Sequence, residues 1–287
     1  MPLTWKIRLA LAAILAGFAV TAASTMLGTR SAAPREPLPD LVQLVPGTFQ
    51  YRAGGDFTRG GRPATAPIVG VFARALVVMR HQVTVGEYHR CVNAGACRRG
   101  DETSADDLPM VKISWWDAAG YAAWLSRSTG KSFRMPTDEE WVYAAGSRFT
   151  DSEGAGDTDS RDPGRRALDR YERETAIKGG VAPEPRPIGH FGANEHGLLD
   201  IAGNVWEWTN SCFVRGILDA GGKPSTTSVD CGVRVVEGRH RTYMTDFIRD
   251  ARAGGCTAGL PPSNLGFRLV LDDDWWSWLR GFAGWAK

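Results

Sequence analysis

The chain has 287 residues, a formal net charge of +2, 11 tryptophans and 34 glycines. This length allows one large domain with a sizeable core, and the near-neutral charge gives no basis for a nucleic-acid partner. The many glycines and tryptophans indicate a loop-rich fold pinned by aromatic side chains, and no internal repeat is present.

The N-terminal segment, residues 1–29, reads as an export signal. Lys6 and Arg8 precede an uncharged, mostly apolar run over 9–28, with small residues around Ala22-Ala23-Ser24. This pattern is typical of a cleaved signal peptide, and the run is also long enough to act as a signal anchor. A proline-containing linker over 30–40 would follow. We expect the domain to be periplasmic, or anchored in the inner membrane and facing the periplasm.

Export makes disulfides the favoured interpretation of the five cysteines. Cys91 and Cys97 can close a short loop at a helix end, and Cys212 and Cys231 bracket the segment 213–230. Cys256 is then left over. The pairing rests on proximity alone, and other connectivities stay open.

The chain between the linker and residue 145 predicts strands followed by helices. We expect a strand over 41–51 that turns at Pro46-Gly47, a loop over 59–67 and an apolar strand over 68–79. The S/T-x-x-E/D spacing of a capping box predicts three helix starts, at Thr84/Glu87, Ser114/Asp117 and Thr137/Glu140. The second helix is expected to end before Gly130. Helical spacing assigns Trp116, Ala119, Ala123 and Trp124 to its core face and Trp141 and Ala144 to that of the third.

The stretch Gly197-Leu-Leu-Asp-Ile-Ala-Gly-Asn-Val-Trp-Glu-Trp-Thr209 organises the rest of the sequence. Gly203-Asn204 forms a turn that tolerates positive φ, and the alternation that follows places Trp206 and Trp208 on one face and Glu207 on the other. A carboxylate among large aromatics needs a cation or hydrogen-bond donors if it is buried. A core strand with a satisfied glutamate is the simplest interpretation.

This stretch resembles the signature of the formylglycine-generating enzyme (sulfatase-modifying factor) family. The blocks Arg134–Ala145 and Asn264–Val270 resemble two further motifs of that family, in the same order. The resemblance covers residues 41–272 and implies a compact α+β fold of the formylglycine-generating-enzyme (C-type-lectin-like) type, with little regular secondary structure. It also implies that Arg134 belongs to the scaffold.

By the same resemblance, the sequence carries one of the family's two calcium sites. The positions that match are Gly203, Asn204 and Val205, through their carbonyls, and the carboxylate of Glu207, a ligand set that suits calcium. A second calcium loop cannot be placed in the polar region 149–187. Asp157, Asp159 and Asp169 are candidate ligands there, and a solvated charged loop is the alternative.

The copper site of the family is missing from the sequence. The resemblance implies that two copper-binding cysteines should lie within a segment that corresponds here to 234–252, and this segment contains no cysteine. Cu(I) is selected by soft thiolates, so copper-dependent formylglycine generation is not expected. Related sulfoxide synthases hold iron with three histidines, but the histidines at positions 81, 89, 190, 196 and 240 show no metal-binding spacing. The redox metal therefore stays unknown.

Four residues of this segment are the candidate ligand-binding set: Arg239, His240, Arg241 and Tyr243. Guanidinium groups bind carboxylates, phosphates and sulfates bidentately. The alternative is intramolecular ion pairing with Asp246 and Asp250. Arg249 and Arg252 match a structural R-x-x-R of the family, so we expect them to be scaffold.

The tail, 273–287, carries Trp275, Trp278, Phe282 and Trp285 near one helical face, which fits docking on a membrane surface or packing on the domain itself. Two functions follow from the sequence. The first is oxidative modification or maturation of a peptide or small exported substrate, as the resemblance to pyoverdine-maturation relatives implies. The second is a non-catalytic, calcium-stabilised binding or accessory module of the cell envelope.

Overall fold

The computed structural model describes residues 36–100, 105–151, 184–249 and 265–272, all of which belong to one compact unit, Glu36–Lys287. The segment 1–29 that we predict to be an export signal lies outside the described residues, as do Asp157, Asp159, Asp169, Asp250, Arg252, Cys256 and the tryptophan-rich tail. Within the described part of the chain, no helix is long and apolar enough to cross a membrane.

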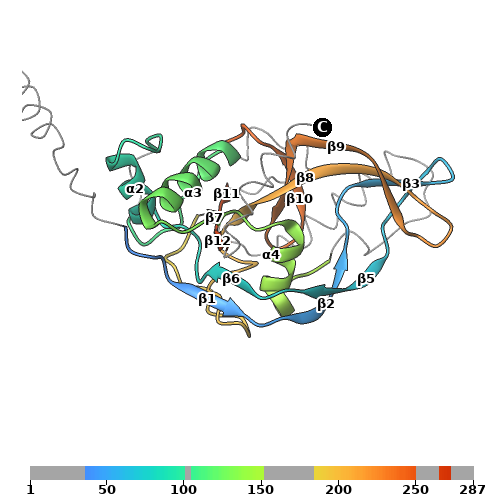
Figure 1. Cartoon of the computed structure of the whole chain (residues 1–287), viewed down its shortest axis with the longest axis horizontal. Coiled ribbons are helices and arrows are strands. Elements are labelled where there is room, and N and C mark those ends of the chain that lie inside the picture. Colours follow the sequence, from blue (N-terminus) through green and yellow to red (C-terminus); the bar gives the residue numbers. More distant parts are fainter. Residues whose placement is uncertain (1–35, 101–104, 152–183, 250–264, 273–287) are drawn as a thin grey trace, which may run out of the picture. The chain divides into compact units, whose positions relative to one another are not determined.

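The described residues form three sheets and three α-helices, which confirms the α+β class (Figure 1). A four-stranded sheet has the order β1 (Leu41–Leu44), β6 (Leu76–Met79), β12 (Val270–Leu271) and β7 (Phe133–Arg134). A larger sheet has the order β10 (Thr242–Thr245), β9 (Pro224–Glu237), β8 (Trp206–Leu218), β3 (Asp56–Arg59) and β4 (Arg62–Ala64), with β11 (Leu265–Gly266) also on β8. β2 (Gly47–Arg52) and β5 (Ile68–Ala73) pair separately. The helices are α2 (Val85–Asn93), α3 (Trp115–Thr129) and α4 (Asp138–Ala145), and α4 continues into the 3-10 turn η1 (Gly146–Arg148).

The strand predictions hold in part. The turn at Pro46-Gly47 separates β1 from β2, as expected, and the apolar run 68–79 is divided between β5 and β6, which lie in different sheets. The prediction of a loop over 59–67 was wrong, because β3 and β4 form a hairpin there. Gly60 and Gly61 make its turn with φ values of 56° and 75°, a conformation that favours glycine.

All three predicted capping boxes are present. Thr84, Ser114 and Thr137 each accept a hydrogen bond from the backbone N–H three residues later, and the acidic side chain at that position accepts one from the cap's own N–H. These bonds satisfy donors that a helix start otherwise leaves unpaired. α3 ends at Gly130, which adopts φ 72°.

The predicted inner face of α3 was partly wrong. Trp124 is buried, but Trp116 is 50% exposed and Ala123 also faces outward. The buried face instead contains Trp115, Ala118, Tyr121, Ala122 and Leu125. Because the two tryptophans are adjacent in the sequence, the helix could be rotated about its axis so that either one faces the core. Trp115 takes the inner position, where its indole N–H donates to Thr209 O at 3.0 Å.

Both predicted disulfides are present. Cys91–Cys97 closes the turn after α2, and Cys212–Cys231 joins β8 to β9. The segment between Cys212 and Cys231 is the outer part of the β8–β9 hairpin.

We expect the two tryptophans of α3 and α4 to differ sharply in their effect on stability. Trp141 is fully buried and its indole N–H donates to Glu207 at 2.8 Å, so Trp141→Phe leaves a cavity and removes a donor from a buried carboxylate. Urea unfolding should show a loss of about 2–4 kcal/mol. The matched change Trp116→Phe at the exposed position should stay within about 0.5 kcal/mol. Equal losses would contradict the placement of these side chains.

Candidate functional site

The signature stretch begins in a loop that its own polar side chains hold in place. Asp200 adopts φ 57°, and its carboxylate accepts the N–H groups of Gly189 and Phe191. Asn194 donates to Ala144 O and Ala145 O at the end of α4, so the loop is tied to that helix. Asn204, at φ 56°, exchanges two hydrogen bonds with the backbone of Arg186. The loop therefore has a defined conformation without regular secondary structure.

Glu207 follows this loop on β8 and is completely buried. Arg268 binds it bidentately, with Nε–Oε2 at 2.6 Å and Nη2–Oε1 at 2.8 Å. Gln82 donates to Oε1 at 2.7 Å and Trp141 to Oε2 at 2.8 Å. Each carboxylate oxygen thus accepts two bonds, and the guanidinium supplies the cation that burial of Glu207 requires.

Glu207 does not fit the calcium ligand that the resemblance implied. Both of its oxygens are fully engaged, and a calcium ion at the carboxylate would lie against the Arg268 guanidinium. The side chain of Asn204 is committed to Arg186. No group of three or more His, Cys, Asp or Glu side chains placed to hold a metal occurs in the described residues. Calcium binding by carbonyls of 203–205 stays a prediction.

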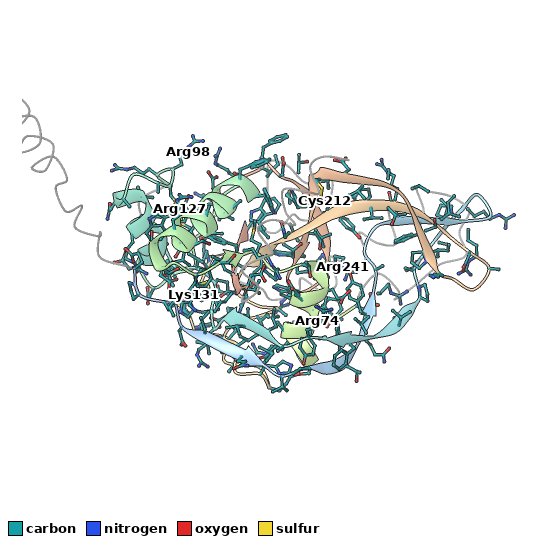
Figure 2. All side chains as sticks on the ribbon, in the orientation of Figure 1. Arg74, Arg98, Arg127, Lys131, Cys212 and Arg241 are labelled. Atoms are coloured by element: carbon teal, nitrogen blue, oxygen red, sulfur yellow. A yellow bond between two sulfur atoms is a disulfide. The ribbon has the colours of Figure 1, made fainter. Side chains whose placement is uncertain are left out.

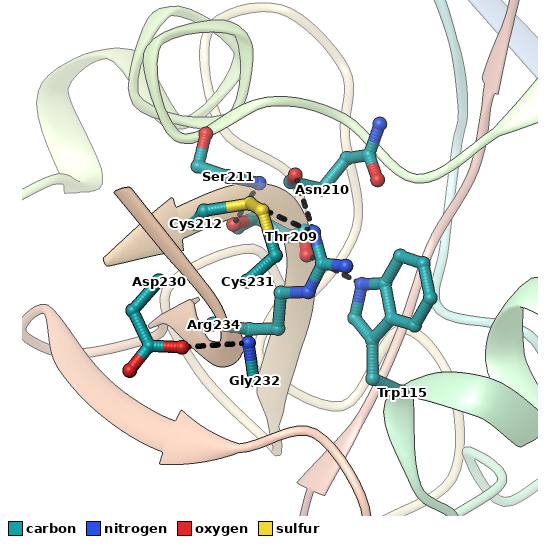
Figure 3. Close-up of a disulfide and its surroundings, with 9 residues drawn as sticks. All are labelled: Trp115, Thr209, Asn210, Ser211, Cys212, Asp230, Cys231, Gly232 and Arg234. Carbon is teal, nitrogen blue, oxygen red and sulfur yellow. Dashed lines mark hydrogen bonds between the residues drawn. A yellow bond between two sulfur atoms is a disulfide. The ribbon is translucent and has the colours of Figure 1, made fainter. Parts of the chain in front are cut away.

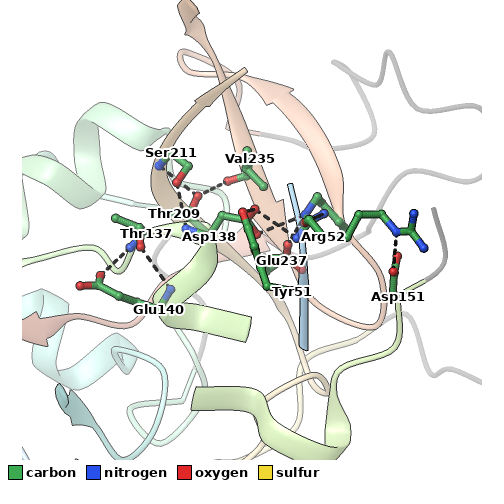
Figure 4. A network of polar contacts seen from close by, with 11 residues as sticks. Tyr51, Arg52, Thr137, Asp138, Glu140, Asp151, Thr209, Ser211, Val235 and Glu237 are labelled. Carbon is green, nitrogen blue, oxygen red and sulfur yellow. Dashed lines mark hydrogen bonds and ion pairs between the residues drawn. The ribbon is translucent and has the colours of Figure 1, made fainter. Parts of the chain in front are cut away.

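A second buried polar cluster contains Asp138 and Glu237 (Figure 4), and Glu237 is the cross-strand partner of Glu207. Arg241 Nε donates to Glu237 Oε1 at 2.8 Å and to Asp138 Oδ1 at 3.2 Å, and its Nη2 lies 3.1 Å from Asp138 Oδ2. The hydroxyl of Tyr51 donates to Asp138 Oδ2 at 2.6 Å, and Arg241 Nη1 donates to Arg52 O at 3.0 Å. One arginine therefore faces two carboxyl groups.

Glu237 is the carboxyl group of this cluster whose pKa is raised. Burial raises the pKa of Glu237 well above its usual range, Arg241 opposes the shift, and the neighbouring Asp138 adds to it. Burial and Asp138 also raise the pKa of Tyr51, so its phenol stays neutral and donates.

α4 serves both clusters. Asp138 and Trp141 lie three residues apart, on one face of the helix, and reach Glu237 and Glu207, which are cross-strand neighbours on β9 and β8. The backbone N–H of Asp138 also donates to Ser211 Oγ at 2.9 Å. Polar contacts to the two neighbouring strands β8 and β9 thus hold the helix against the sheet.

The predicted ligand-binding residues do not share one surface. Arg239 is exposed, whereas the Arg241 side chain is only 2% exposed and lies among other side chains beside α4 (Figure 2). His240 is buried edge-on against Trp206, with ring centroids 4.5 Å apart. Tyr243 is half-buried and packs on Phe213. Arg241 is thus a structural residue, and its partners are Asp138 and Glu237 rather than the expected Asp246.

Two glycines make room for this packing. A Cβ at Gly238 would lie 2.9 Å from the Trp206 ring, and a Cβ at Gly54 would lie 2.8 Å from the Arg241 side chain. The absence of a side chain at position 238 therefore has a steric reason.

The histidines are dispersed. His196 packs on Tyr143, His190 on Phe191 and His240 on Trp206. His81 contacts Gln82 O, and His89 lies 4.0 Å from Asp106. The described structure does not bring these five side chains into one three-histidine group.

The expected scaffold arginines have scaffold partners. Arg134 pairs with Glu140, the acidic residue of the α4 capping box, and with Asp272. Arg249 binds both oxygens of Asp117, the acidic residue of the α3 capping box, at 2.8 and 3.0 Å. Burial alone would raise the pKa of Asp117, but the bonds from Arg249 and Ser114 outweigh it and hold that pKa below its usual range.

Sequence reasoning missed four partners: Gln82, Asp138, Glu237 and Arg268. Arg268 and Asp138 both lie inside blocks that resemble family motifs, and Arg268 is the one charged residue of its block, Asn264–Val270, which was the available signal. Glu237 ends the apolar run Val235-Val236, and that position gave a similar hint. Nothing local marks Gln82.

Comparison with known families decides the assignment. A model of the sulfatase-modifying factor enzyme 1-like domain (FGE-sulfatase) matches residues 27–273. The chain belongs to the sulfatase-modifying factor family.

Relatives within this family include active and inactive enzymes. The chain is 30% identical to formylglycine-generating enzyme of Mycobacterium tuberculosis over 240 residues, covering 61% of this chain and 75% of that protein. It is 34% identical to inactive C-alpha-formylglycine-generating enzyme 2 of Mus musculus over 175 residues, covering 57% of this chain and 49% of that protein. The chain thus spans about half of the mouse relative.

The fold is similar to that of PvdO from Pseudomonas aeruginosa. The TM-score is 0.52 at 25% identity, with 82% of this chain and 94% of the PvdO chain covered.

The raised pKa of Glu237 predicts how stability depends on pH. Because its pKa in the folded state lies above the unfolded value of roughly 4.3, the stabilisation is complete below that pH and is lost as pH rises toward the folded pKa. Glu237→Gln mimics the protonated form, so this variant should lose less stability between about pH 4.5 and 8. Chemical unfolding across this range measures the difference.

The matched control for Glu237→Gln is Asp107→Asn, which removes an exposed carboxylate. It should leave the pH dependence of the parent unchanged. Parallel pH profiles for Glu237→Gln and the parent would show that folding does not raise the pKa of Glu237.

Proposed function

We propose that this sulfatase-modifying factor relative is an exported binding or accessory module, one that recognises a peptide or small molecule and does not perform copper-dependent formylglycine generation. The proposal rests on the composition and the packing of the segment 234–249. It contains no cysteine where the family resemblance calls for copper thiolates, and its Arg241 is built into the interior. A segment fixed in this way stabilises the fold instead of holding Cu(I).

The two disulfides support export. Cys91–Cys97 and Cys212–Cys231 both have partners at bonding distance, and such bonds persist in oxidising compartments. The basic residues and apolar run at the start of the sequence agree with this location. The similarity to an inactive mouse relative shows that the family includes members without this activity.

Exposed Arg239 is the residue through which we expect the module to meet an anionic ligand. It lies between β9 and β10 and precedes His240, whose ring packs on Trp206. Its guanidinium can bind a carboxylate, phosphate or sulfate group.

Oxidative modification of a peptide or small exported substrate is the second candidate. The similarity to an active mycobacterial enzyme over 75% of its length favours it. In that case the redox centre would differ from the family's cysteine pair.

The first test is catalytic. The purified domain is loaded with Cu(I) and offered a sulfatase-derived cysteine peptide in the presence of oxygen, with the mycobacterial enzyme as positive control. Mass spectrometry should show an unchanged peptide, and conversion of cysteine to an aldehyde would overturn the proposal.

The second test is binding. The domain is isolated from the envelope of cells that produce it, and native mass spectrometry should then reveal a retained peptide or small molecule. Arg239→Ala should lose this species, and Arg127→Ala, a change at an exposed arginine of α3, should keep it. Absence of any retained species would contradict the binding role, and release of an oxidised species would favour the second candidate.

A further inference from the structure

The Cys212–Cys231 disulfide sits at an irregularity of the β8–β9 hairpin (Figure 3). Cys212 is paired with Arg234 in the strand register, but the next residue, Phe213, is paired with Asp230. Three residues of β9, Cys231 to Val233, therefore bulge between these pairs. The disulfide clamps this bulge, and bulges often accompany functional positions.

The two sulfur-bearing residues differ in access. Cys231 is exposed and Cys212 is half-buried. An incoming thiolate therefore reaches Cys231 more readily, which leaves Cys212 as the departing sulfur. Direction matters here, because the rate of exchange depends on how well the departing thiolate is stabilised.

A buried guanidinium stands beside the departing sulfur. Arg234 Nη1 donates to Cys212 Sγ at 3.3 Å and to Asn210 O at 3.1 Å. Its guanidinium carbon lies 3.8 Å above the centre of the Trp115 ring. Arg234 is 6% exposed, and its Nε has no hydrogen-bond partner among the residues described.

The positive charge of Arg234 is poorly compensated. Burial lowers the pKa of Arg234, and Asp246 opposes this only at a distance. No carboxylate within 4.0 Å of Arg234 occurs in the described structure. The carboxylate of Asp230, near Cys231, instead accepts the N–H of Gly232. A thiolate at Cys212 would give this buried cation the anion it lacks, and neighbouring cations favour thiolates.

We propose that Cys212–Cys231 is a thiol–disulfide exchange site, with Cys231 as the attacked sulfur and Cys212 as the departing thiolate held by Arg234. The substrate class is a thiol, either a small molecule or a cysteine of a partner peptide. This activity is additional to the binding role and does not depend on it.

The exchange balances without a metal. The incoming thiolate forms a bond to Cys231 Sγ, the Sγ–Sγ bond breaks, and its electron pair remains on Cys212 as a thiolate. A second thiolate then attacks the incoming group's sulfur, which releases an external disulfide and leaves two reduced cysteines. Loss of the clamp frees the outer part of the hairpin at the bulge.

The test measures the rate of reaction with reduced glutathione and with a cysteine-containing peptide. Acid quenching, alkylation and peptide mapping then report each disulfide separately. Cys91–Cys97 is the internal control, because Cys91 is completely buried. Cys212–Cys231 should react at least about tenfold faster, and the mixed disulfide should form on Cys231. A preference for glutathione or for the peptide distinguishes the two sources of thiol, and either preference supports exchange.

Variants at Arg234 isolate the role of its charge. Arg234→Gln should slow exchange by about tenfold and raise the pKa of the Cys212 thiol in the reduced protein, whereas Arg234→Lys should keep most of the rate. Arg215→Gln, a change at an exposed arginine of β8, should leave it unchanged. Circular dichroism verifies that each variant is folded at the assay temperature.

Three results would overturn the proposal. They are equal rates for the two disulfides of the parent protein, an adduct on Cys212, and an unaltered rate in folded Arg234→Gln. The first two need no variant, so a failure of Arg234→Gln to fold leaves the test decisive.

Discussion

The buried pair of Glu207 and Arg268 sets the geometry of the whole domain. A carboxylate removed from water must find a cation and fill its acceptor positions, and four donors from three parts of the chain do this for Glu207. Arg268 must in turn place its remaining N–H groups, which it does on carbonyls of Met79, Arg80 and Leu199. One ion pair thus joins the four-stranded sheet, the signature loop, β8 and α4.

The second cluster extends this constraint to the segment 234–249, which corresponds in position to the copper-binding segment of the family. α4 contributes Asp138 as well as Trp141, and Asp138 engages Arg241 and Glu237. Because Arg241 is held there, the β9–β10 segment is part of the scaffold. The chain therefore belongs to the family, but we do not expect it to perform the copper chemistry of the family's active members.

Local chemistry allowed much of the fold to be predicted. The capping boxes depend on side chains three residues apart, and the hairpin disulfide brackets a single segment, so the sequence contained both signals. The prediction of the buried face of α3 was partly wrong because Trp115 and Trp116 are adjacent, and only tertiary contacts decide which of the two is buried. The β3–β4 hairpin was not predicted because its strands are short and polar, and local periodicity cannot distinguish such strands from a loop.

The candidate site was harder to predict because its partners are remote in the sequence. Arg268 lies 61 residues from Glu207, and Asp138 lies 103 residues from Arg241. The sequence showed that a buried Glu207 needs a cation or hydrogen-bond donors, and the fold supplies the Arg268 guanidinium together with donors from Gln82 and Trp141. The same limit applied to Arg241: the sequence offered an internal ion pair as an alternative, but its remote partners Asp138 and Glu237 were not foreseen.

A double-mutant cycle on Glu207 and Arg268 tests this account most directly. Urea unfolding is measured for the parent protein, Glu207→Gln, Arg268→Met and the double variant. Each single change should cost about 3–5 kcal/mol, because it leaves one buried charge unpaired. The double variant should cost at least about 2 kcal/mol less than the sum of the two. Additive losses would contradict the account and show that something other than Arg268 compensates Glu207.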